Sequence, residues 1–386
     1  MRIVKALLPV IAVILLAMLA RDNYAKLTSS VLIALDFLPG LLIVLVIAVA
    51  VYFNRLSILL GVLVFSFVYI CHLYNWLDTE LNLSLIAITT PILLLFNQIF
   101  TKQSILSIRS IPIYLTFIVI VGFCFWIIDH NPTWAVYYIE KDWLPAEYFN
   151  WSKLPQSALA SYCFVFIGLL IIFSKKQNLE SIITVVALIA TYGLMGSLEN
   201  RDLVLLISSI MILNLIALLQ KSRQMAYVDE LTLLPGRRAL EEKLQSLVGI
   251  YTIAMVDIDH FKKFNDKFGH DTGDDVLRMI ASKLNAVKGG GSAYRYGGEE
   301  FTIVFSNKST EQTLEQLEAV RENIAQSKFV VNRRMSTSKN NKSTSVKITV
   351  SIGVADSIDI TNANEVIKKA DIALYKSKKK GRNCIT

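Results

Sequence analysis

The nine residues "AYRYGGEEF", positions 293–301, place two glycines and two glutamates between short runs of β-prone residues. Two glycines between strand-like runs are the ordinary signal of a tight β-hairpin. The sequence therefore predicts a hairpin with "SAYRY" and "FTIVFS" as its strands. On these residues alone, two interpretations stay open: a turn with no further role, or a turn that holds acidic side chains at a binding site.

Outward from the hairpin, the chain from about residue 225 to its end alternates between strand-like and amphipathic segments. Predicted strands are "IYTIAMVDI" (250–258) and "VKITVSIGVA" (346–355). Predicted helices are "FKKFNDKFG" (261–269), "DTGDDVLRMIASKLNAV" (271–287), "TLEQLEAVRENIAQ" (313–326) and "ANEVIKKADIALYKSKKKG" (363–381). Strands interleaved with helices indicate an α/β domain in which helices flank a central sheet.

The first 220 residues differ in composition from the rest of the chain. They hold most of the apolar sequence of a 386-residue chain that is 54% hydrophobic. Apolar stretches lie at 4–20, 31–53, 57–76, 82–100, 112–128, 157–174, 181–198 and 203–219. Each is near the ~20 residues that a membrane-spanning helix needs. We therefore expect an all-α polytopic membrane region (1–219), a short linker (220–228) and a soluble domain (229–386). The first stretch resembles a signal-peptide core, but its weak cleavage site favours a retained span.

Basic residues in the loops predict the orientation of these spans. With eight spans both termini share one side, and that side collects more Lys and Arg than the other, including Arg55, Arg109 and Lys176, whereas the basic residues of the opposite side are mostly interleaved with Asp and Glu. Both termini are therefore predicted to be cytoplasmic. The longest outer loop, 129–157, is rich in Trp and Tyr, which indicates either a ligand-binding segment or aromatic residues of the membrane interface.

Acidic residues gather where the strand 250–258 ends. Asp257 directly follows the apolar run and is the better candidate for a metal ligand, whereas a helix cap is the favoured role for Asp259. If the hairpin pairs with this strand, Glu299 and Glu300 come close to Asp257. Three neighbouring carboxylates repel one another unless a cation neutralises them, and Mg²⁺ prefers such oxygen ligands.

Further candidates surround this acidic group. The helix that begins in "HFKKFND" offers backbone amides to a phosphate, and Asn265 and Asp274 suit the edge of a guanine base. Lys378 and Arg382, four residues apart, are predicted to share a helix face as phosphate ligands, although a solvated basic helix end is the simpler explanation. The pattern GxxxxGK[ST] is absent, which excludes a P-loop, and no CxxC pair indicates a thiolate zinc site.

Six motifs together resemble those of the GGDEF domain, the diguanylate cyclase family, and they cover about two-fifths of the chain. They are "DELTLLPGRRAL" (229–240), "DIDHFKKFND" (257–266), "GHDTGDDVL" (269–277), "GGEEF" (297–301), "VSIGVA" (350–355) and "ALYKSKKKGRN" (373–383). The resemblance implies a nucleotide-cyclase-like fold and a transferase that condenses two GTP molecules into cyclic di-GMP, releasing two pyrophosphates. It also implies a homodimer, a bacterial protein, and Mg²⁺ or Mn²⁺, two per site.

The resemblance assigns roles to individual residues. By position, Asp257, the Ile258 carbonyl, Glu299 and Glu300 resemble the metal ligands, and Glu299 and Glu300 are the catalytic candidates, Glu299 assisting deprotonation of the ribose 3′-hydroxyl. The positions that resemble substrate-binding residues are Phe261, Lys262, Asn265, His270, Asp274, Gly297, Gly298, Lys378 and Arg382.

Two departures from the family pattern stand out. Lys288 and Gly291 occupy the positions of an RxxD product-inhibition motif, so we expect weak or absent feedback through that site. A basic, Ser-rich loop at 332–345 has no assigned role. Combined with the apolar stretches, the resemblance predicts a multi-pass enzyme of the bacterial inner membrane, controlled by an unknown sensory ligand and without a nucleic-acid partner. The alternatives are a catalytically silent nucleotide receptor and a regulatory tail of a membrane protein.

Overall fold

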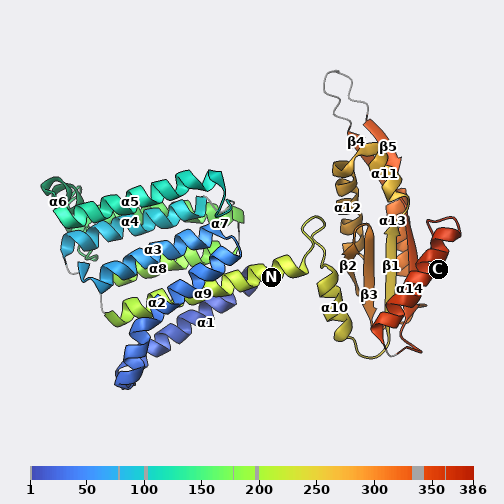
Figure 1. Ribbon diagram of the computed structural model, residues 1–386, viewed down its shortest axis with the longest axis horizontal. Helices are drawn as coiled ribbons and strands as arrows, with labels where there is room; N and C mark the ends of the chain where they lie inside the picture. The colour runs from blue at the N-terminus through green and yellow to red at the C-terminus, as the bar shows by residue number, and fades with distance from the viewer. Residues whose placement is uncertain are drawn as a thin grey trace. The chain divides into compact units, whose positions relative to one another are not determined.

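The computed structural model describes residues 2–76, 79–99, 103–176, 178–195, 200–332, 343–360 and 362–386 (Figure 1). Most of the predicted loop 332–345 lies outside these residues. The chain divides into two compact units, residues 1–222 and residues 223–386, and each is described by itself.

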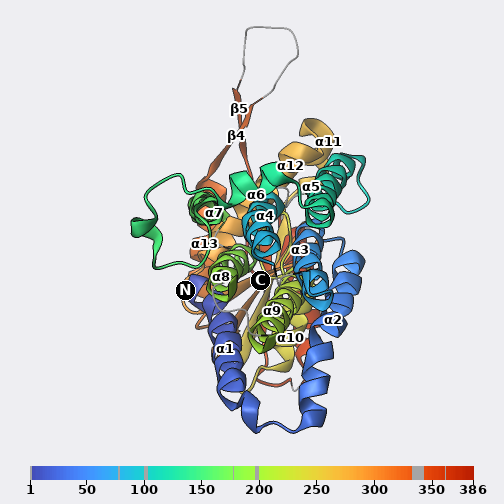
Figure 2. The same ribbon diagram turned by 90° about the vertical axis from the view of Figure 1, so that its left-hand side faces the viewer.

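The N-terminal unit is helical. Its α-helices are α1 (Arg2–Asn23), α2 (Ser29–Tyr52), α3 (Leu56–Leu73), α4 (Glu80–Ile99), α5 (Ile111–His130), α6 (Thr133–Glu140), α7 (Gln156–Lys176), α8 (Leu179–Met195) and α9 (Asn200–Tyr227), with 3₁₀ turns η1 (Tyr24–Lys26), η3 (Ile108–Ser110) and η4 (Ala146–Phe149). Helix α4 contacts α3, α7 and α8, as the end-on view in Figure 2 shows. Helix α9 continues past the end of this unit through Tyr227.

Each of the eight apolar stretches overlaps one of these helices. Seven helices among the described residues have the length and apolarity to cross a membrane, and the apolar α8, with 17 described residues, is shorter. Large apolar side chains are exposed on the outside of the bundle, for example Leu115, Ile118 and Val119 on α5. Such a surface is compatible with lipid contact, because a helix satisfies its own backbone hydrogen bonds.

The C-terminal unit contains a four-stranded antiparallel sheet in the order β2–β3–β1–β6. The strands are β1 (Tyr251–Ile258), β2 (Gly291–Gly297), β3 (Glu300–Ser306) and β6 (Val350–Asp356), and a separate hairpin pairs β4 (Lys328–Asn332) with β5 (Ser343–Lys347). Strand β1 is central and all eight of its residues are buried. An α/β sheet buried on both faces reads in sequence as a continuous apolar run, which is why 250–258 was predictable.

Helices cover both faces of this sheet. They are α10 (Arg237–Gln245), α11 (Phe261–Phe268), α12 (His270–Asn285), α13 (Leu314–Gln326) and α14 (Ala363–Lys379). Ala254 and Val256 face the core with α11, α12 and α13, whereas Ile253 packs with α10 and α14 and Met255 packs with α14. Helix α14 lies so close to β6 that a side-chain carbon at Gly353 would overlap the α14 backbone at Ala370 and Leu374.

One predicted strand is wrong in its extent. The stretch 346–355 is divided between β5 and β6, and the interruption at Ile348–Thr349 separates two different sheets. The Thr349 carbonyl instead accepts a hydrogen bond from the Asp259 amide (2.9 Å), which joins β6 to the end of β1. A continuous β-prone run carries no signal for such a change of partner, and strand β4 was not predicted.

Candidate active site

Three carboxylates meet at one end of the central sheet. Asp257 is the seventh residue of β1, is only 5% exposed, and lies opposite Glu300, the first residue of β3, in the antiparallel register. Glu299 occupies the turn directly before Glu300 and is half-buried. Strand pairing thus brings together residues that are more than forty positions apart in the sequence.

The electrostatics of this cluster follow from burial and like charge. Burial raises the pKa values of Asp257, Glu299 and Glu300, and the Asp257 charge raises the values of both glutamates further. The Lys378 ammonium opposes these effects, because its Nζ lies 2.8 Å from Asp257 Oδ2. The arrangement favours a second cation, whose charge would offset the remaining repulsion.

The donor set fits a hard divalent cation that also binds substrate. No group of three His, Cys, Asp or Glu side chains within the described part of the chain forms a ready-made metal site. Mg²⁺ usually takes one or two protein carboxylates together with water and substrate phosphates, and it does not require such a cage. The Asp257 and Glu299 carboxylates and the Ile258 carbonyl, at the end of β1, could supply the protein's share.

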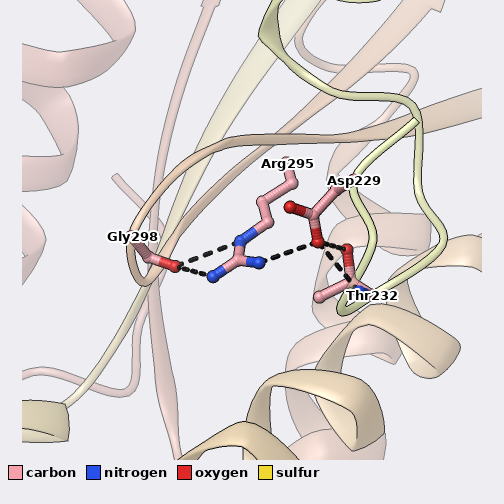
Figure 3. A network of polar contacts seen from close by, with 4 residues as sticks. All are labelled: Asp229, Thr232, Arg295 and Gly298. Carbon is pink, nitrogen blue, oxygen red and sulfur yellow. Dashed lines mark hydrogen bonds and ion pairs between the residues drawn. The ribbon is translucent and has the colours of Figure 1, made fainter. Parts of the chain in front are cut away.

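The glycine turn itself is held by an arginine (Figure 3). The Arg295 guanidinium donates two hydrogen bonds to the Gly298 carbonyl (3.2 and 2.8 Å) and one to Asp229 Oδ1 (2.7 Å). The same Asp229 oxygen accepts from the Thr232 amide (2.8 Å) and hydroxyl (2.6 Å). Gly298 has a φ of +52°, a conformation that L side chains rarely adopt, so glycine suits the turn.

This network also sets the charge of Asp229. Burial by itself raises the pKa of Asp229, but the hydrogen bonds from Thr232 and Arg295 outweigh burial and lower it overall. Asp229 is therefore ionised at neutral pH and pairs with Arg295. The segment that follows α9 is thereby joined to the turn that carries the acids.

The start of α11 faces the same region of the fold. The first bond within this helix runs from the Phe264 amide to the His260 carbonyl (3.0 Å), so the amides of residues 261–263 have no partner inside the helix. Phe261 is buried and anchors the helix start, whereas the Lys262 side chain is exposed. Amides at a helix start suit a phosphate group.

Asn265 on α11 lies against α12. A side-chain carbon at Gly273 would overlap Asn265 Oδ1, which places Asn265 beside the turn of α12 that carries Asp274. Asn265 Oδ1 is buried and has no hydrogen-bond partner, and Asp274 is half-buried. An acceptor without a donor next to a carboxylate fits a ligand that has N–H groups. His270 begins α12 with an exposed side chain.

Two sequence interpretations require correction. Lys378 and Arg382 do not share a helix face, because α14 ends at Lys379 and Gly381 (φ +111°) turns the chain before Arg382. Arg382 nevertheless lies near enough to Asp257 for its charge to oppose, in small part, the rise that burial causes in the pKa of Asp257.

Asp259 is not a helix cap. Its carboxylate accepts hydrogen bonds from Thr349 Oγ1 (2.7 Å), Ser351 Oγ (2.6 Å) and the Asn383 amide (3.1 Å). Asp259 therefore ties the C-terminal segment to the end of β1.

The structure shows what surrounds the two positions at which the RxxD product-inhibition motif is absent, Lys288 and Gly291. Lys288 is exposed. A side-chain carbon at Gly291 would come within 2.7 Å of the Phe305 ring and 2.9 Å of Val287 Cγ1. An aspartate at 291 would therefore displace packed side chains of the core.

Sequence reasoning missed Arg295 and Asp229, the residues that support the turn. The available signal was local: the spacing Asp-x-x-Thr at 229–232 is typical of an aspartate that binds the backbone after it, and Arg295 lies two residues before the glycines. That these two segments meet follows from tertiary contacts and was not visible in the sequence.

The C-terminal unit is similar to known proteins. Residues 226–384 match the family model described as "Diguanylate cyclase, GGDEF domain". "Diguanylate cyclase VdcA" of Vibrio cholerae is 37% identical over 169 residues, 43% of this chain and 48% of that protein. "Response regulator PleD" of Caulobacter vibrioides is 35% identical over 178 residues, 43% of this chain and 37% of the relative. A similar solved structure is the crystal structure of the coiled coil and GGDEF domain of DgcB from Caulobacter crescentus in complex with c-di-GMP. Its sequence is 35% identical to this chain, the match covers 44% of this chain and 88% of that one, and the TM-score is 0.39.

The C-terminal unit is thus an α/β domain with an acidic cluster at one end of an antiparallel sheet. Its segment 226–384 matches the model of the GGDEF domain and is similar to a diguanylate cyclase. The similarity spans less than half the length of each of the two curated relatives.

Proposed function

We propose that this protein is a membrane-bound diguanylate cyclase, which condenses two GTP molecules into cyclic di-GMP and two pyrophosphates. The observation that carries the proposal is the register of β1 and β3, which places Asp257 opposite Glu300, beside Glu299, on the residues of the GGDEF signature. Similarity to two proteins named diguanylate cyclases, at 36–37% identity, supports it.

The reaction requires the 3′-oxygen of each GTP to attack the α-phosphorus of the other, so that two phosphodiester bonds form and two pyrophosphates leave. Asn265 and Asp274 would orient the guanine base through its N–H donors, and the amides at the start of α11 would bind phosphate. Lys378 and Arg382 would neutralise the triphosphate charge. Glu299, whose pKa burial raises, is suited to accept the proton of the 3′-hydroxyl.

A divalent cation would be held by the Asp257 and Glu299 carboxylates, with Glu300 beside them, and by the Ile258 carbonyl. When bound, it supplies charge neutralisation at the phosphates and alignment of the attacking and leaving oxygens. We expect two such ions per site, Mg²⁺ or Mn²⁺. Because two GTP molecules must face each other, the active form would be a homodimer in which each copy presents one substrate.

The helical unit would hold the enzyme in the inner membrane and control it. Seven described helices have the length and composition of membrane spans, which supports this location. Helix α9 leads directly from that unit into the GGDEF domain, so a ligand that changes α9 could change the domain's activity.

The test uses full-length protein in nanodiscs with GTP and Mg²⁺, beside a Glu299→Gln variant of equal volume. We expect cyclic di-GMP from the wild type and a loss of at least about a hundredfold in the variant, the usual size of a lost general-base contribution. Product from both proteins at equal rates would contradict the role of Glu299. If neither protein makes product although GTP binds, the receptor alternative would be favoured over the cyclase.

A further inference from the structure

Helices α1, α8 and α9 line an open cavity in the N-terminal unit. Near one end the three helices pack tightly through a buried apolar cluster that includes Val10, Ile183 and Leu213. Toward the other end they separate around a space of about 630 Å³. Figure 2 shows the three helices as neighbours. A volume of this size is typical of sites for drug-sized ligands.

The lining of the cavity is apolar except at one end. Apart from Arg21, Asp202 and a serine, the lining side chains are aliphatic, or absent at Gly193. A side-chain carbon built at Gly193 would find no atom within 4 Å. The wall at this position is therefore open space that an apolar chain could fill.

The polar end carries an incompletely satisfied ion pair. Arg21 Nη2 lies 2.8 Å from Asp202 Oδ2, and the Asp202 side chain is only 9% exposed. Asp202 Oδ1 is buried and forms an ion pair with the Nε atom of Arg201 at 3.8 Å, but it has no hydrogen-bond partner. A buried acceptor without a donor costs free energy, which a ligand could recover. The Arg21 side chain is 53% exposed, so part of its guanidinium can receive an anion.

The surroundings indicate that a ligand arrives from the bilayer. Met18 and Ile189 line the cavity and are 58% and 56% exposed, so the opening carries large apolar side chains. The occupant must combine an apolar chain, an N–H donor for Asp202 and an anionic group for Arg21. A phospholipid with a primary ammonium head group has all three.

We propose that the cavity between α1, α8 and α9 binds a phospholipid with a primary ammonium head group, whose N–H donates to Asp202 Oδ1 while its phosphate contacts Arg21. This inference rests on the membrane location proposed above. The ligand would contact α9, the helix that continues into the GGDEF domain.

The test is photo-crosslinking of full-length protein in phosphatidylcholine nanodiscs. One sample contains phosphatidylethanolamine with a diazirine in its acyl chain, and the other contains the matched phosphatidylcholine, whose trimethylated head group cannot donate an N–H bond. We expect the first probe to label α8 and α9 peptides roughly tenfold more strongly, as one charge-assisted hydrogen bond would give.

Gly193→Leu should fill the cavity and reduce labelling by phosphatidylethanolamine to the phosphatidylcholine level. Gly122→Leu is the matched control, because Gly122 on α5 also has open space around it but lies outside the cavity. Asp202→Asn keeps an acceptor oxygen but removes its charge, so this variant should reduce the preference between the probes. If that variant misfolds, Gly193→Leu still tests whether the probe binds in the cavity, because it leaves the Arg21–Asp202 ion pair unchanged.

Equal labelling by both probes, or labelling that Gly193→Leu does not reduce, would overturn the inference and leave only general lipid contact. Incorporation into nanodiscs is recorded separately by co-elution with the scaffold protein. Failure to incorporate would contradict the membrane location and this inference together, whereas incorporation without probe preference would contradict this inference alone.

Discussion

At the scale of single residues, the Lys378 ammonium contacts the same carboxylate, Asp257, that a divalent cation would bind. Its ammonium is 2.8 Å from Asp257, a carboxylate whose side chain is only 7% exposed. Breaking a buried pair leaves an uncompensated charge, which then attracts any available cation. In the proposed cyclase, the lysine and a metal ion would therefore compete for Asp257, and the phosphates of a bound substrate would draw the lysine away.

We predict that Lys378→Met tightens Mn²⁺ binding in the absence of nucleotide by about tenfold, since a competitor worth about 1.4 kcal/mol is removed. Electron paramagnetic resonance titration of free Mn²⁺ measures the affinity. Lys376→Met is the matched control, because Lys376 is an exposed lysine on the same helix. An unchanged Mn²⁺ affinity in Lys378→Met would show that the ion pair does not limit metal binding.

Asp229 gives a second prediction at this scale. The folded pKa of Asp229 is lowered, so its contribution to stability is present above the unfolded pKa of about 3.9 and is lost as pH falls through the folded pKa. Asp229→Asn should lower the unfolding free energy of segment 223–386 by about 1–3 kcal/mol at pH 7, the worth of charged hydrogen bonds.

The difference between wild type and Asp229→Asn should shrink as the pH falls below about 4. Urea unfolding at a series of pH values measures it. Asp275→Asn is a suitable control, because Asp275 forms an exposed pair with Arg278 on α12. A wild-type advantage that stays constant down to strongly acidic pH would contradict the Arg295–Asp229 interaction as the cause.

The sequence predicted the acids of the site but not their support. Asp257, Glu299 and Glu300 stood out because carboxylates at a strand end and a glycine turn carry a local signal. The pairing of Arg295 with Asp229 spans 66 positions and depends on how the chain folds back, so no local pattern contains it. The ion pair between Lys378 and Asp257 also joins residues that are far apart in the sequence. The sequence analysis predicted Lys378 only as a phosphate ligand and not as a partner of Asp257.

At the scale of elements, the close approach of α11 and α12 shapes the predicted base site. Gly273 leaves room for Asn265, whose Oδ1 atom occupies the space that a side chain would take. Alanine normally favours a helix over glycine by up to about 1 kcal/mol. Gly273→Ala should therefore keep the fold while forcing the Asn265 amide out of position.

We predict that Gly273→Ala weakens binding of a nonhydrolysable GTP analogue by about tenfold, the loss of roughly one hydrogen bond. Isothermal titration calorimetry measures the affinity. Because the effect acts through Asn265, Gly273→Ala combined with Asn265→Ala should weaken binding no further than Asn265→Ala alone. Ser282→Ala, at an exposed position of α12, is the control. Additive losses in the double variant would contradict this mechanism.

In the C-terminal unit the predicted strands 250–258, 292–296 and 301–306 correspond to β1, β2 and β3, whereas helix α10 and strand β4 were not predicted. The amphipathic stretches 313–326 and 363–381 correspond closely to α13 and α14, because the apolar spacing of a helix is set by its own period. The run 346–355 was divided between two sheets, and its break follows from the Asp259–Thr349 contact. Strand pairing partners lie far away in the sequence, so period alone cannot assign them.

At the scale of the whole molecule, whether α8 crosses the membrane decides on which side of the membrane the GGDEF domain lies. Helix α8 has 17 described residues, fewer than the other apolar helices, yet it is apolar throughout most of its length. If α8 spans the bilayer, eight spans place both termini on one side, and the loop basic residues put that side in the cytoplasm. If it does not, the C-terminal unit faces the opposite side.

We predict that α8 spans, because the proposed enzyme needs cytoplasmic GTP. Alkaline phosphatase, which is active only outside the cytoplasm, should be active when fused after Asp142 in the predicted outer loop and inactive when fused after Leu106 or after Thr386. Green fluorescent protein at the same three positions should give the reverse pattern and controls for expression. Phosphatase activity at Thr386 would mean an odd number of spans, and a cyclase with its site on that side would lack its substrate.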